Sequence, residues 1–238
     1  MLVLALATVV VAVSCTIHGA VGFGMNLMAV PVLAALDPAL VPGPAVAAGL
    51  VLSVLILVRE PATLDPQLGW AVLGLLPGTC AAVALLAVVP SSALALPIGI
   101  LVVLAVVLSA TPVHLSPHRI SLGVAGVASG FLATAASIGG PPLALLYSRS
   151  EGARLRNNLS AFFVITAVTS LAALVLSGHF GSPEWRASAL ILPGVVIGFV
   201  ASGPMRRVLD RGRTRPAVLT LSALAGIVAI IEGLLHLR

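Results

Sequence analysis

The chain has 238 residues, of which 60% are apolar and only 8% carry a charge. Soluble domains carry about 25% charged residues, and a surface so poor in charge would not stay in solution. With a mean hydropathy of +1.20, the composition excludes a soluble globular protein. It predicts an integral membrane protein with lipid around most of its surface.

The charged residues and the cysteines exclude several kinds of site. All twelve basic residues are arginine, and this excess is typical of cytoplasmic loops, so we expect no nucleic-acid partner. Cys15 and Cys80 lie in separate apolar stretches, which predicts neither a disulfide nor a metal site. The first apolar run continues past Ala20 without a cleavage site, so Met1 is expected to begin the mature chain.

Charge, proline and glycine divide the sequence into eight apolar blocks. In chain order they are Leu2–Leu36, Ala45–Val58, Leu68–Val89, Ala93–Ala110, Ile120–Tyr147, Leu159–Leu176, Ala187–Gly203 and Ala217–Leu235. At about 20 residues per crossing, these blocks leave no room for a soluble domain. The predicted fold class is therefore an all-α integral membrane protein whose function lies within the membrane.

The first and fifth blocks are expected to be broken helical hairpins. The first block has no charge before Asp37, and a straight helix of that length would overshoot a hydrocarbon core about 30 Å thick. Glycine-rich segments at 18–26 and 137–142 supply the places where the chain can turn back.

Short matches within the sequence indicate two homologous halves. The segment 31–36 (PVLAAL) aligns with 142–147 (PLALLY), and LLPG at 75–78 aligns with ILPG at 191–194. We predict a first membrane repeat over 1–112 and a second over 117–238, joined by a linker at 111–117.

The arginines favour inverted rather than parallel halves. If each hairpin returns to its own side, ten arginines lie in the cytoplasm and only Arg186 and Arg238 lie outside. If each broken block crosses once, the distribution is eight against four. The positive-inside rule therefore favours inversion, with both termini outside.

The breaks are the predicted substrate site. Helix N-termini carry partial positive charge and free N–H donors, so two of them meeting near the midplane can bind an anion. The blocks contain no mid-span Asp or Glu, and so offer little to a cation. The expected substrate-binding residues are His18, Gly22, Gly24, Asn26, Thr134, Ser137, Gly139 and Gly140.

Several of these residues also have a purely structural explanation. The break glycines can serve backbone geometry alone, and His18 can bond a neighbouring helix instead of binding substrate or relaying a proton. Arg154 and Arg156 are expected to anchor the chain at the cytoplasmic face, or to attract anions to an inner mouth. Three glycine pairs with GxxxG spacing are expected to pack helices: Gly74/Gly78, Gly126/Gly130 and Gly194/Gly198.

Three segments carry a family resemblance. They are Gly22-Phe23-Gly24, the more specific run SGFLATAASIGGPPL at 129–143, and RLRNNL at 154–159. Over nearly its whole length the sequence resembles the sulfite exporter TauE/SafE family. The resemblance implies a small permease of bacterial inner membranes that moves sulfite, sulfonates or related organic anions, often outward. The first break departs from the Gly-Gly-Gly often found there, because Met25 and Asn26 follow Gly24.

The leading hypothesis is a secondary carrier of a small oxyanion that works by alternating access, with membrane lipid as its surroundings. An anion channel built on the same breaks is the nearest alternative. An intramembrane hydrolase is disfavoured because Ser129 lacks a nucleophile motif and the spans lack metal-binding acids. No catalytic residue or cofactor is predicted, while the coupling ion (proton or sodium), the transport direction and the oligomeric state stay open.

Overall fold

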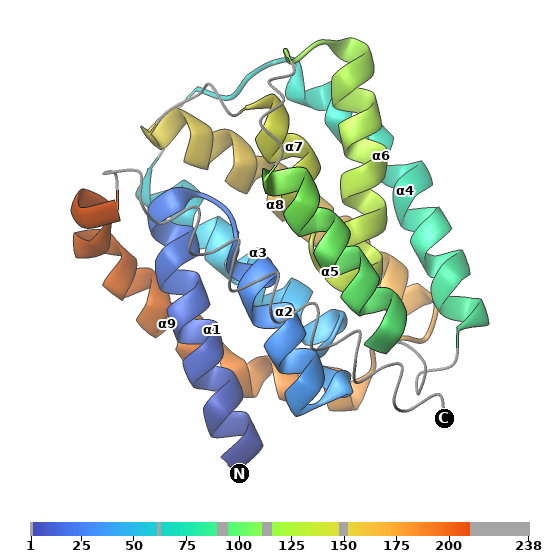
Figure 1. The fold of residues 1–238 in the computed structure, drawn as a ribbon, viewed down its shortest axis with the longest axis vertical. Coiled ribbons are helices and arrows are strands. Elements are labelled where there is room, and N and C mark those ends of the chain that lie inside the picture. Colours follow the sequence, from blue (N-terminus) through green and yellow to red (C-terminus); the bar gives the residue numbers. More distant parts are fainter. Residues whose placement is uncertain (1, 61–62, 90–94, 111–115, 148–151, 210–238) are drawn as a thin grey trace.

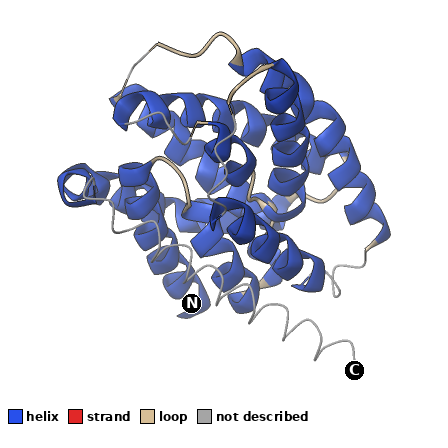
Figure 2. Cartoon of the chain, turned by 45° about the horizontal axis from the view of Figure 1, so that its top comes forward, coloured by secondary structure: helices blue, strands red, loops and turns tan. Residues whose placement is uncertain are grey.

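The computed structural model describes residues 2–60, 63–89, 95–110, 116–147 and 152–209. Within these ranges all regular structure is helical (Figure 2). Six helical segments are long and apolar enough to cross a membrane. The predicted all-α class is confirmed, whereas the last predicted block, Ala217–Leu235, lies outside the described residues.

The helices follow the predicted blocks closely. In chain order they are α1 (Leu2–Val21), α2 (Met25–Leu36), the short 3-10 helix η1 (Pro38–Leu40), α3 (Gly43–Arg59), α4 (Leu68–Val88), α5 (Ala95–Ala110), α6 (Arg119–Ala136), α7 (Gly140–Leu146), α8 (Gly152–Leu176) and α9 (Ser182–Leu209). The largest differences are in α8 and α9, which begin at Gly152 and Ser182, each with a polar turn that precedes its predicted apolar block.

Both breaks form where the glycines predict them, although they are shorter than expected. Gly22 and Gly24 separate α1 from α2 with φ angles of 105° and 107°, a region that glycine enters without steric cost. Between α6 and α7, Ser137 adopts the left-handed conformation with φ of 61°. His18 belongs to the last turn of α1 rather than to the break.

Among the described helices, two pairs make the most extensive contacts: α1 lies along α9, and α4 lies along α6 (Figure 1). A Cβ atom at Gly78 would overlap the backbone oxygen of Val127, and one at Gly126 would overlap that of Ala71. Gly194 and Gly198 meet the backbone of α1 in the same way. The packing role predicted for the three GxxxG pairs is confirmed.

Alanine at Gly126 is expected to lower the melting temperature of the detergent-solubilised protein. The added methyl group would push α4 away from α6, and overpacking of this kind costs about 1–3 kcal/mol. Gly123→Ala on the same helix is the matched control, because its Cβ would meet only the Trp70 backbone oxygen, at 4.0 Å. Equal melting temperatures for the two variants would contradict the packing role.

The central helices place the breaks face to face. α3 packs against both α8 and α9, and α5 contacts the two short helices α2 and α7 that follow the breaks. One buried apolar cluster joins α1, α2, α3, α5 and α9 and includes Ile138 of the second break, and a second cluster joins α4, α6, α7 and α8. Phe23 of the first break packs against both clusters, so both breaks lie in the apolar interior.

Candidate functional site

A cavity of about 60 Å³ lies where the two breaks meet. Since one water molecule needs ~15 Å³ of such volume, the cavity has room for about four water molecules or one small ion. Its lining comes from the breaks and from the facing parts of α1, α3, α6 and α8. The lining residues include His18, Phe23, Gly24, Asn26, Ser53, Ser137, Gly139, Gly140 and Phe163.

Asn26 joins the two breaks directly. Its Nδ2 donates a hydrogen bond of 2.7 Å to the backbone oxygen of Ser137, which lies 111 residues further along the chain. The Ser137 hydroxyl in turn donates to the backbone oxygen of Pro42, also at 2.7 Å, just before α3 begins. The first break, the second break and the start of α3 are therefore held together at one wall of the cavity.

His18 holds the first break from inside α1. Its Nδ1 accepts a hydrogen bond of 3.3 Å from the backbone N–H of Met25, the first residue of α2. Because that N–H can only donate, the neutral imidazole carries its proton on Nε2. The ring packs edge-on against Phe163, with centroids 5.9 Å apart. The Nε2 is buried and has no partner among the described residues.

Two further polar atoms of the lining are buried without a partner in the described part of the chain. They are the Asn26 Oδ1 and the Ser53 hydroxyl, and Ser53 is only 1% exposed. A buried polar atom left unpaired costs about 1–3 kcal/mol, so three of them at one cavity call for an explanation. All three atoms belong to residues that line the cavity, so a polar ligand bound there is a candidate partner for them.

Six of the eight residues expected to bind substrate line this cavity: His18, Gly24, Asn26, Ser137, Gly139 and Gly140. Thr134 does not, because its hydroxyl lies 2.8 Å from that of Ser170 and 3.4 Å from that of Thr79, where it links α6 to α8 and α4. Gly22 does not line it either, and faces the side chain of Arg156 instead.

The sequence analysis missed Ser53, Phe23 and Phe163, which also line the cavity. Ser53 lies within the otherwise apolar second half of α3, at 50–58, and an isolated hydroxyl there is the only sequence signal that could have found it. Among the described residues, no three His, Cys, Asp or Glu side chains come together in an arrangement that could hold a metal ion.

Comparison with known families decides the class of protein. The family model described as sulfite exporter TauE/SafE matches residues 6–229. The chain belongs to this family. It is therefore an integral membrane protein and a transporter of the sulfite and anion exporter class, not an enzyme. No curated protein and no solved structure matches the chain.

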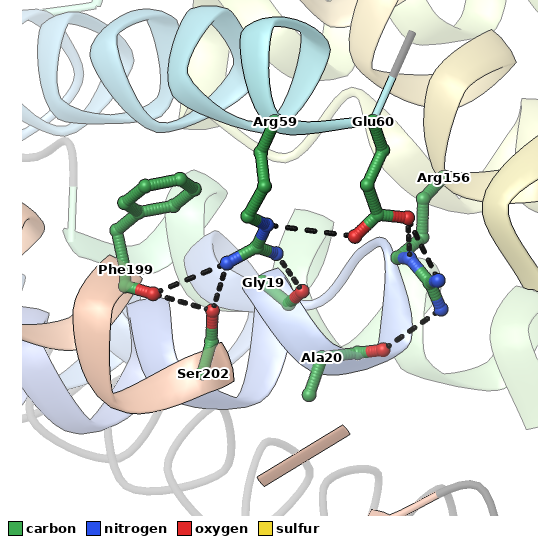
Figure 3. Close-up of polar contacts among 7 residues, drawn as sticks. All are labelled: Gly19, Ala20, Arg59, Glu60, Arg156, Phe199 and Ser202. Atoms are coloured by element: carbon green, nitrogen blue, oxygen red, sulfur yellow. Dashed lines mark hydrogen bonds and ion pairs between the residues drawn. The ribbon is translucent and has the colours of Figure 1, made fainter. Parts of the chain in front are cut away.

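In this TauE/SafE transporter a charged cluster, formed by Arg59, Glu60 and Arg156, lies beside the first break (Figure 3). Glu60 Oε2 accepts from Nε of Arg156 at 2.8 Å and pairs with its Nη2 at 2.8 Å. Glu60 Oε1 lies 3.5 Å from Nε of Arg59. One carboxylate thus neutralises part of the charge of two guanidinium groups at the junction of α3 and α8.

The two arginines of the charged cluster also bind the end of α1 (Figure 3). Arg59 donates to the backbone oxygen of Gly19 at 2.7 Å, and Arg156 donates to that of Ala20 at 3.3 Å. Arg59 further donates to the Ser202 hydroxyl of α9 at 2.7 Å. Because the last carbonyls of a helix lack partners within the helix and carry partial negative charge, cations stabilise this end.

Arg156 is therefore not the surface anchor that the sequence analysis expected. It is 8% exposed, lies inside α8 and is paired with Glu60. The neighbouring Asn158 is also buried and accepts from the backbone N–H of Asp65 at 2.7 Å. Arg156 and Asn158 thus join α8 to the end of α3 and to the loop after it, whereas Arg154 of the same polar segment is exposed.

Gly22→Ala is expected to destabilise the TauE/SafE protein more than Gly178→Ala does. Both glycines have positive φ, of 105° and 76°, so alanine is strained at either position, by roughly 1–2 kcal/mol. At Gly22 the new Cβ would also lie 2.7 Å from Cγ of Arg156, whereas at Gly178 nothing lies within 4 Å. Melting temperatures of the two variants in detergent measure the difference, and equal losses would exclude a role for the Arg156 contact.

Proposed function

We propose that the protein is a secondary carrier of sulfite, an organosulfonate or a related small oxyanion, and that the cavity between the breaks is its binding site. The observation that carries this proposal is the Nε2–H of His18, a buried donor without a partner among the described residues, on a side chain that lines that cavity. An anionic oxygen is a strong acceptor for such a donor. The N-terminus of α2, which begins at Met25 beside it, adds partial positive charge.

The two halves, 1–112 and 117–238, are proposed to be inverted repeats. The arrangement of α3 and α8, which take corresponding places in the halves, supports this proposal because the two helices are antiparallel. Glu60 at the end of α3 pairs with Arg156 near the start of α8, and Gly43 at the start of α3 contacts Phe180 just after α8. The contacts at both ends of the two helices are therefore those of an antiparallel pair.

Helix pairing supports the same proposal. α1 begins the first half and packs along α9 of the second, while α6 begins the second half and packs along α4 of the first. Each pair contains a broken helix and the helix that carries the Leu-Pro-Gly sequence, and each approaches through small residues. The halves therefore exchange equivalent contacts, as a two-fold relation requires.

Alternating access is the mechanism that we propose for this arrangement. Opening the cavity past the end of α1 would separate α1 from α3 and α8, and so break the contacts of the charged cluster. We propose that this end faces the cytoplasm and that the protein lies in a bacterial inner membrane, because the positive-inside count favours this orientation. The charged cluster would then hold the carrier closed on the cytoplasmic side.

Exchange transport in liposomes tests the proposal. Purified protein is expected to take up radiolabelled sulfite in a saturable way, and to do so faster when the liposomes are loaded with unlabelled sulfite. An anion channel would instead give conductance without such acceleration. The proposal fails if sulfite, methanesulfonate and acetate all remain outside under proton and sodium gradients of either direction.

Two serine variants link the transport to the cavity. Ser53→Ala removes a lining hydroxyl and is expected to weaken sulfite binding about 2- to 10-fold, the value of one hydrogen bond. Ser129→Ala is the matched control, since Ser129 is equally buried, also has no partner in the described structure and does not line the cavity. Equal sulfite affinity of the two variants would place the binding site elsewhere.

A further inference from the structure

The hydrogen-bonding direction of His18 is fixed by the backbone. Its Nδ1 accepts from the Met25 N–H, a group that cannot accept in return. The neutral ring therefore presents an N–H donor at Nε2. Rotating the ring to exchange the two nitrogens would leave the Met25 N–H without this acceptor.

The backbone also fixes the orientation of the Asn26 amide, which leaves an acceptor without a partner where His18 leaves a donor. Its partner is the backbone oxygen of Ser137, which only accepts, so the amide nitrogen must occupy the position 2.7 Å away. The Asn26 Oδ1 is consequently an acceptor, buried and without a partner in the described part of the chain. If the nitrogen and oxygen of the amide were exchanged, the Asn26 Oδ1 would lie 2.7 Å from the Ser137 backbone oxygen, and two acceptors would repel each other.

The remaining polar side chains of the lining add no further donor or acceptor of fixed direction. The hydroxyl of Ser137 already donates to Pro42, and that of Thr166 donates to the backbone oxygen of Phe162. The Ser53 hydroxyl can donate or accept. Among the described residues that line the cavity, none is Arg, Asp or Glu. The side chains of the lining therefore offer one fixed donor, one fixed acceptor and no full positive charge.

These features discriminate between charge states of an oxyanion. The electrostatic cost of moving an ion out of water rises with the square of its charge, and no cationic side chain of the lining offsets it. A dianion would also place a charged oxygen against the Asn26 Oδ1. A monoanion with its own N–H or O–H group has a much smaller desolvation cost than a dianion and avoids the second penalty.

We propose that the carrier selects singly charged anions that bear a hydrogen-bond donor, such as hydrogensulfite rather than the sulfite dianion. An anionic oxygen accepts from His18 Nε2, and the donor of the substrate bonds Asn26 Oδ1. This inference rests on the proposed function of the cavity and names the substrate class of that same site. It makes Asn26 a specificity-determining residue.

Sulfamate and methanesulfonate test this inference, because they have the same charge and nearly the same size. Sulfamate carries an amino group that can donate to Asn26, and methanesulfonate carries a methyl group in its place. Each is added as a competitor to sulfite exchange in liposomes. Sulfamate is expected to inhibit at about tenfold lower concentration, as one extra hydrogen bond provides.

The outcomes separate the inference from the proposed function. Equal inhibition, or stronger inhibition by methanesulfonate, overturns the selection for a donor while leaving an anion site in the cavity. No inhibition by either compound, together with no sulfite exchange, overturns both.

The Asn26→Leu variant assigns the selectivity to this side chain. It removes the acceptor, and the preference for sulfamate over methanesulfonate is expected to fall from about tenfold to about one. Retention of the tenfold preference in this variant would overturn the role of Asn26. If the variant does not fold, the comparison of the two competitors on the unaltered protein still decides whether the site selects a donor.

Discussion

A Glu60→Gln variant is expected to lose about 3–5 kcal/mol of stability, because removal of one partner from a buried ion pair leaves the other charge uncompensated. The side chains of Glu60 and Arg156 are each only 9% exposed, so water cannot replace the lost carboxylate. Glutamine keeps the size of the side chain and removes its charge. The melting temperature in detergent and the yield of folded protein measure the loss.

Two comparisons show whether burial within the charged cluster is the cause. Glu184→Gln makes the same change at a partly exposed position in the first turn of α9, where the carboxylate accepts from the nearby Gly181 N–H and forms no ion pair within the described residues. We expect a loss below about 1 kcal/mol there. Leucine at both Glu60 and Arg156 removes the pair together, and is expected to recover most of the stability that Glu60→Gln loses.

The result also bears on alternating access. If the charged cluster holds the carrier closed, the leucine pair should fold and yet populate the state open at this end more than the unaltered protein does. Chemical labelling of a cysteine introduced at Phe23 in the break reports that opening. Identical labelling of the two proteins would argue that opening the carrier does not require the charged cluster to separate.

The parts of the fold that depend on local chemistry were predictable from the sequence. Gly22 and Gly24 mark the first break because few other residues adopt their φ angles, and Pro141 follows the second break at the start of α7. The GxxxG pairs mark close helix contacts because only small residues allow backbones to approach so closely. Each signal lies within a few residues of the feature that it predicts.

Features that depend on distant partners were not predictable in this way. Thr134 and Ser137 share a face on a continued helix, but α6 ends at Ala136 and the left-handed turn at Ser137 changes the direction of the chain. Thr134 therefore faces Ser170 of α8 instead of the cavity. Periodicity predicts a shared face only while the helix continues.

The ion pair between Glu60 and Arg156 illustrates the same limit. The two residues lie 96 positions apart, and each belongs to a short polar segment that resembles a loop beside a membrane span. These charges are recognised as buried only when the three-dimensional structure shows that the end of α3 packs against the start of α8. Ser53 is similar, since its place in the cavity depends on which face of α3 meets the breaks.

Substitutions of His18 are expected to separate its two roles. His18→Asn can keep an acceptor near the position of Nδ1 for the Met25 N–H, and loses the donor at Nε2. His18→Gln can keep a donor near the position of Nε2, and loses the acceptor. We expect the Asn variant to fold normally and to bind sulfite about 10- to 150-fold more weakly, because a hydrogen bond to a charged ligand contributes about 1.5–3 kcal/mol.

The Gln variant should show the reverse, with a lower melting temperature and a smaller loss of sulfite affinity. His18→Phe keeps a ring that can pack edge-on against Phe163 and removes both nitrogens, so it should lose stability and binding together. Sulfite affinity from the exchange assay and melting temperature in detergent are measured on all three variants. If the Asn and Gln variants bind sulfite equally well, Nε2 does not donate to the substrate, and the contribution of His18 is confined to holding the first break.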